Sequence, residues 1–113
     1  KASLLSVPKT SVKTEFGDRY IAFVNTQCSS CNRMVEQVLG SLQLGVSLDI
    51  HFKKDSRQAI TQWANKQGIS AESVEVGTVT LNPDSLLNEQ FGQPAEPSLY
   101  YFNKATNQVS EVK

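Results

Sequence analysis

The sequence of 113 residues predicts one α/β domain in which helices flank a central mixed β-sheet. Strand-like segments, identified by alternating apolar residues or by β-branched and aromatic composition, alternate along the chain with segments whose apolar residues have helical spacing. This order is typical of parallel strands joined by right-handed crossovers. Two strand-like segments close the chain with a short turn between them, which predicts an antiparallel hairpin. The length is close to the commonest size of one domain, so a single sheet of parallel and antiparallel pairs is expected.

The first eighteen residues give a weaker signal than the rest of the chain. One apolar cluster is followed by Pro8 and by a run rich in Ser, Thr and Lys, and Gly17-Asp18 forms a turn signal. We expect residues 1–18 to be an N-terminal extension or an edge strand, and residues 19–113 to be the folded domain.

The stretch Arg19–Leu42 carries a pair of cysteines between a strand and a helix. Tyr20–Val24 is aromatic and β-branched, as in a buried strand, and apolar residues recur at helical spacing after Cys31. Cys28 and Cys31 therefore stand at a helix N-terminus, where unpaired N–H groups and the helix dipole favour negative charge. Such positions, and Cys-x-x-Cys pairs, lower thiol pKa values to about 3.5–7.5, so redox chemistry is indicated.

The middle of the chain predicts a second strand and a second helix. Ser47–Lys53 alternates with apolar residues on one face, which places His51 on the polar face as a partly exposed residue. Asp55 is expected to cap the next helix, with Gln58 at capping-box spacing. Trp63 lies on the apolar stripe of this helix and is expected in the core, and a short turn follows at residues 70–73.

The last third predicts a strand, a helix and the hairpin. Residues 76–81 form a short extended piece, after which Asn82 is expected to cap a helix that begins at Pro83 and ends at Gly92. Its inward residues would be Leu86, Leu87 and Phe91. The hairpin is expected to pair residues 98–102 with residues 108–112.

Composition excludes several classes of function. Eleven Lys and Arg residues balance eleven Asp and Glu residues, so no basic excess points to nucleic acid or anionic lipid. No apolar run approaches the ~20 residues of a membrane helix. Two cysteines exclude a multi-bridge scaffold and fit a cytosolic reductase or an exported redox domain. Ser, Gln and Asn together make 29 of 113 residues, which favours export.

Other interpretations of the cysteine pair compete with redox activity. A static bridge is one, and a zinc site is another, but structural zinc wants four ligands and only Cys28, Cys31 and His51 are at hand. We expect no metal and no cofactor. Glu96 would oppose a thiolate if it bordered Cys28, and its alternative is a solvated loop carboxylate.

The arrangement of two motifs resembles the thioredoxin fold. Cys28-Ser29-Ser30-Cys31 follows a strand and opens a helix, and Glu96-Pro97-Ser98 precedes a strand far downstream. The resemblance implies a cis bond before Pro97 and a βα insertion after the Cys-x-x-Cys helix. It implies thiol–disulfide exchange in which Cys28 is the nucleophile, Cys31 resolves the mixed disulfide, and Ser29 and Ser30 form the active-site dipeptide. Glu96, Pro97 and Ser98 would bind the substrate.

A narrower resemblance is to thioredoxin-like proteins of bacterial integrating conjugative elements, through Trp63–Ile69 and Val79–Asn82. It implies an exported, periplasmic protein whose partners are thiols or disulfides of other exported proteins, although the chain shows no signal or anchor. Ordinary thioredoxins differ in having Trp at Gln27, Gly-Pro between the cysteines and a buried acid at Ala22. The alternative function is a non-catalytic interaction module of a conjugation or secretion apparatus. The oligomeric state stays open.

Overall fold

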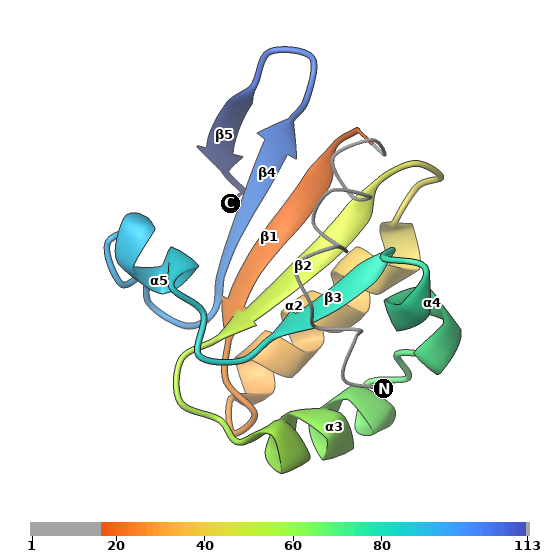
Figure 1. Ribbon diagram of the computed structural model, residues 1–113, viewed down its shortest axis with the longest axis vertical. Helices are drawn as coiled ribbons and strands as arrows, with labels where there is room; N and C mark the ends of the chain where they lie inside the picture. Colours follow the sequence, from red (N-terminus) through yellow and green to blue (C-terminus); the bar gives the residue numbers. More distant parts are fainter. Residues whose placement is uncertain (1–16, 113) are drawn as a thin grey trace.

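A computed structural model describes residues 17–112 of the chain. Residues 1–16 and 113 lie outside this range, so the expectation of an extension or edge strand at residues 1–18 falls almost wholly outside the described residues. Within the described part, the α/β architecture with a mixed sheet is confirmed (Figure 1).

Five strands form one sheet in the order β3-β2-β1-β4-β5. Parallel pairing joins β1 to β2 and β2 to β3, whereas β4 runs antiparallel to β1 and β5 antiparallel to β4. The central strand β1 is therefore parallel to one neighbour and antiparallel to the other. The strands are β1 (Arg19–Val24), β2 (Ser47–Phe52), β3 (Val79–Asn82), β4 (Ser98–Asn103) and β5 (Gln108–Glu111).

Three helices pack on one face of the sheet and enclose the main core. They are α2 (Ser29–Ser41), α3 (Arg57–Lys66) and α4 (Ala71–Glu75), and α2 crosses behind the strands in Figure 1. The helices bury the apolar stripes that their spacing predicted, and α4 occupies the turn expected at residues 70–73. No helix between residues 17 and 112 is long and apolar enough to cross a membrane. The core residues are Ala22, Val24, Cys31, Val35, Val38, Leu48, Ile50, Phe52, Ile60, Trp63, Ala64, Ile69, Val74, Val79 and Leu99.

The opposite face carries an aromatic cluster that the prediction for His51 did not anticipate. Phe91, which follows the short helix α5 (Leu87–Gln90), packs on Phe23 and Tyr100 with ring centroids 5.2 and 4.8 Å apart. The His51 ring lies 5.4 Å from that of Phe23 and is only 8% exposed. The partly exposed position expected for His51 is therefore wrong, because β2 is covered on both faces. Its Nδ1 lies 2.7 Å from the Ser85 hydroxyl.

Two helix starts differ from those predicted by the sequence. Ser56 rather than Asp55 caps α3, its hydroxyl accepting from the N–H of Ala59 at 3.1 Å. The last helix begins at Leu87 rather than Pro83, because Asn82 is the last residue of β3 and pairs with His51 of β2, and Asp84 has a left-handed backbone with φ 49°. Leu86, expected to face inward, is 72% exposed.

A carboxylate at the start of β1 joins this strand to the terminal hairpin. Asp18 accepts hydrogen bonds from the Tyr101 hydroxyl on β4 and from the backbone N–H of Lys104, the latter at 2.9 Å. The Tyr101 bond, and then the Lys104 bond, hold the pKa of Asp18 below its usual value. The bond to Asp18, followed by burial, raises the pKa of Tyr101 to about 12.

Asp18→Asn is expected to lower the pKa of Tyr101 from about 12 toward the ordinary tyrosine value of about 10, because the charged acceptor is lost. In the wild type the Asp18 bond stabilises the fold above the unfolded pKa of about 3.9, and this contribution is lost as pH falls through the depressed folded pKa. The Tyr101 contribution is complete below about pH 10 and is lost as pH rises through about 12. Phenolate absorbance against pH measures the tyrosine shift. Asp84→Asn, on an exposed turn, is the matched control and should leave it unchanged.

Candidate functional site

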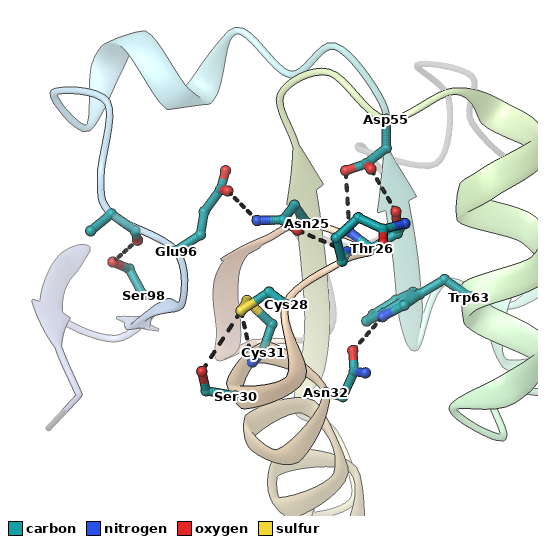
Figure 2. Close-up of a disulfide and its surroundings, with 12 residues drawn as sticks. Asn25, Thr26, Cys28, Ser30, Cys31, Asn32, Asp55, Trp63, Glu96 and Ser98 are labelled. Atoms are coloured by element: carbon teal, nitrogen blue, oxygen red, sulfur yellow. Dashed lines mark hydrogen bonds between the residues drawn. A yellow bond between two sulfur atoms is a disulfide. The ribbon is translucent and has the colours of Figure 1, made fainter.

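The two cysteines form a disulfide at the start of α2, at the edge where the parallel strands end (Figure 2). Cys28 is the N-cap residue of the helix, with an extended backbone, and its Sγ accepts from the N–H of Cys31 at 3.1 Å. An N-cap side chain normally accepts an N–H that has no partner in the first helical turn, and here sulfur takes that role. The Cα atoms of the pair are 5.2 Å apart.

The two sulfurs differ in their access to solvent. Cys28 is half-buried, whereas the side chain of Cys31, in the first turn of α2, is fully buried in the core. Ser29 and Ser30 between them are exposed, and the Ser30 hydroxyl lies 3.9 Å from the Cys28 sulfur. An incoming group therefore reaches Cys28 before it reaches Cys31.

The segment that resembles the thioredoxin proline loop lies beside this turn. The Glu96–Pro97 peptide bond is cis, as the resemblance implied, and Pro97 is exposed. Ser98 begins β4 and pairs with Phe23 near the end of β1. The loop that contains Pro97 therefore joins the sheet close to Asn25, the first residue after β1. The Ser98 hydroxyl donates to the carbonyl of Ala95 and holds the loop together.

Glu96 does not behave as a solvated loop carboxylate. Its Oε1 accepts from the Asn25 side-chain amide at 2.8 Å, and its Oε2 lies 3.9 Å from the Lys53 Nζ. The side chain is only 15% exposed. Figure 2 shows Glu96 reaching toward Asn25 above the disulfide. The proline loop and the cysteine loop are thus joined directly by side chains.

Asp55 holds the cysteine loop from the other side. The sequence predicts that Asp55 caps α3, but its Oδ1 accepts from the Thr26 hydroxyl at 2.6 Å and its Oδ2 from the Thr26 N–H at 3.4 Å. The expectation was wrong because the ends of β1 and β2 bring Thr26 next to this carboxylate. Of the loop before Cys28, Asn25 is consequently held by Glu96 and Thr26 by Asp55.

Helix α3 contacts the cysteine turn on its C-terminal side. The Trp63 indole donates to the Asn32 side-chain oxygen at 2.6 Å, and the Gln67 amide donates to the Asn32 carbonyl at 3.0 Å. The Trp63 ring also packs edge-on against Phe52 in the core, as expected from the apolar stripe. Helix α3 and its C-cap residue therefore fix Asn32, the residue that follows Cys31.

Sequence reasoning missed Thr26, Asn25, Asn32 and Asp55 as contributors to the site. A usable signal existed for two of them, because the C-terminal ends of parallel strands meet at one edge of a sheet and bring their following loops together. Asn25 and Asp55 both follow such ends. Among residues 17–112, no group of three or more His, Cys, Asp and Glu side chains is placed to hold a metal ion.

No protein-family model matches the chain, and no curated protein matches it. Solved structures do resemble it, with low sequence identity. A secreted disulfide oxidoreductase of Mycobacterium tuberculosis aligns with a TM-score of 0.66 at 14% identity, covering 86% of this chain and 69% of the other. A thioredoxin-like protein from Aeropyrum pernix gives 0.66 at 13%, covering 84% and 68%. A thiol-disulfide oxidoreductase from Bacteroides fragilis gives 0.62 at 10%, covering 87% and 74%. The chain therefore has a thioredoxin-like fold.

Thr26→Val is expected to lower the free energy of unfolding of the oxidised protein by about 1–2 kcal/mol, because a half-buried hydrogen bond to a carboxylate is lost. Urea denaturation measures this change. Thr61→Val is the matched control, since Thr61 is exposed on α3 and bonds only the Arg57 carbonyl of its own helix among the described contacts. Equal effects of the two substitutions would contradict a special role for the Thr26–Asp55 contact.

Proposed function

We propose that the chain is a thiol–disulfide oxidoreductase that uses the Cys28/Cys31 pair to exchange disulfides with protein partners. The observation that carries the proposal is the disulfide at the N-terminus of α2, with one accessible and one buried sulfur, beside an exposed cis-proline loop. The solved structures with this fold include proteins described as disulfide oxidoreductases, which supports the same activity here.

The exchange proceeds in two steps in the reducing direction. The Cys28 thiolate attacks a substrate disulfide, forming a Cys28–substrate disulfide and releasing one substrate thiolate. Cys31, deprotonated, then attacks the Cys28 sulfur, re-forms the Cys28–Cys31 disulfide and releases the second substrate thiolate. Two electrons pass from the pair to the substrate, and the released thiolates take up the two protons that the cysteines lost. Oxidation of a substrate dithiol is the reverse.

The surroundings of Cys28 favour its role as nucleophile. The N–H of Cys31 points at its sulfur, and the thirteen-residue helix α2 directs its positive end toward it, so a thiolate at this position is stabilised. Cys31 is buried one turn further in, where only a partner already bound to Cys28 brings a disulfide within reach.

The loop Glu96–Ser98 is proposed to receive the substrate chain. Pro97 is exposed and has no N–H. Its backbone therefore has no donor that would compete with the N–H groups of the substrate chain. Glu96 is proposed to set the spacing between this loop and the cysteines through its bond to Asn25. Ser29 and Ser30 form the exposed rim over which a partner would approach.

The proposed location is outside the cytoplasm of a bacterium. The Mycobacterium tuberculosis protein of similar fold is described as secreted, and the abundance of Ser, Gln and Asn agrees with export. The sequence resemblance to thioredoxin-like proteins of integrating conjugative elements extends the proposal to partners that are exported components of a conjugation apparatus. Protein thiols or disulfides are the substrates in either case.

Reduction of insulin in the presence of dithiothreitol tests the activity. We expect turnover by the wild type and loss of catalysis to the background rate in Cys28→Ser. Reduced Cys31→Ser, mixed with insulin after dithiothreitol has been removed, should accumulate a mixed disulfide through Cys28, because the resolving thiol is gone.

The order of the two sulfurs is tested by the same pair of variants. If Cys28→Ser trapped substrate through Cys31 instead, the assigned roles would be reversed. Absence of turnover in the wild type, together with no equilibration against a glutathione buffer, would leave the non-catalytic interaction module as the function.

A further inference from the structure

A charged hollow lies next to the cysteine loop and the proline loop. Its volume is about 330 Å³, and it is lined by Asn25, Lys53, Lys54, Asp55 and Glu96. Asn25 is three residues from Cys28, and three residues of extended chain span roughly 10 Å, so the hollow is within reach of a polypeptide attached to the Cys28 sulfur. Figure 2 shows Asn25, Asp55 and Glu96 grouped above the disulfide.

The two carboxylates of the hollow are engaged inward by the cysteine loop. Glu96 accepts from Asn25 at 2.8 Å, and Asp55 accepts from the Thr26 hydroxyl at 2.6 Å. Both carboxylates therefore have a short hydrogen bond to a neighbouring side chain, and the Glu96 side chain is only 15% exposed. These bonds direct both carboxylates toward the cysteine loop and occupy acceptor sites that a cationic ligand would otherwise use.

The two ammonium groups are the more accessible charges of the hollow. The Lys53 side chain is 31% exposed and donates to the Pro94 carbonyl at 3.3 Å, and its Nζ forms an ion pair with Glu96 at 3.9 Å, which is too long for a hydrogen bond. An ammonium has three donors, so this arrangement leaves donors of Lys53 for a ligand. Lys54 is exposed on the same rim.

We propose that this hollow is a subsite for an acidic side chain of the substrate polypeptide, close to its target cysteine. A substrate Asp or Glu would be held by Lys53 and Lys54 while the neighbouring cysteine exchanges with Cys28. The inference rests on the proposed function and adds a substrate class to it, namely polypeptides with a carboxylate within about three residues of the reactive cysteine.

The expected effect is modest because the rim is open to solvent. Exposed ion pairs contribute about 0.2–1 kcal/mol each, so two lysines should give a roughly two- to thirtyfold preference in kcat/KM at low salt. At 1 M salt, where the Debye length is about 3 Å, the preference should shrink toward unity.

The experiment compares three disulfide-linked peptides that are identical except for Asp, Asn or Lys two residues from the cysteine. We expect kcat/KM to fall in the order Asp, Asn, Lys. Lys54→Gln should reduce the ratio of the Asp to the Asn peptide toward unity. Lys66→Gln, which removes an exposed lysine at the far end of α3, is the matched control and should keep the wild-type ratio.

The outcomes separate this inference from the proposed function. Exchange at equal rates with all three peptides, or a preference for Lys, would overturn the subsite and leave the oxidoreductase intact. If no peptide exchanged, the proposed function would fail, and the subsite would then be judged by calorimetry with peptides carrying Ser in place of Cys. Equal affinity for the Asp and Asn versions would overturn the subsite there as well.

Discussion

The site depends on one contact, the bond from the Cys31 N–H to the Cys28 sulfur at the start of α2. This bond places a sulfur where a helix normally uses an oxygen cap, so the positive end of the helix is directed at a group that chemistry can make negative. It exists only because β1 ends at Val24 in the centre of the sheet and the chain turns at once into a helix. Parallel pairing with β2 and antiparallel pairing with β4 fix the position of that end from both sides.

The loop before the cysteines and the first turn of α2 are held by side chains from three distant parts of the chain. Glu96 precedes the cis-proline, Asp55 follows β2, and Trp63 reaches Asn32 from α3. The sheet sets the position of each contributing segment. Each contact joins such a segment to the cysteine turn, which has few apolar residues of its own. Because a short polar loop cannot bury enough surface to order itself, these hydrogen bonds supply the order that the core supplies elsewhere.

The chain keeps a thioredoxin-like fold while differing at positions that matter in ordinary thioredoxins. Ala22, at the position of the buried acid, is fully buried in the core, and Gln27 is exposed before Cys28. Identities of 10–14% to the solved structures named above agree with a fold preserved by its pattern of strands and helices rather than by particular residues. This site differs from that of ordinary thioredoxins in having Asp55, Glu96 and Lys53 around the cysteine turn and no buried acid at Ala22.

The sequence by itself determined the order of strands and helices, the buried stripes, the closing hairpin and the place of both cysteines at a helix start. These follow from local periodicity and from the composition of short segments. Only the tertiary structure decided the burial of His51, the helix start at Leu87 instead of Pro83, and the partners of Asp55 and Glu96. Each of these depends on contacts with residues about 29 to 71 positions away, including the pairing of Asn82 with His51, and periodicity along the chain carries no information about such contacts.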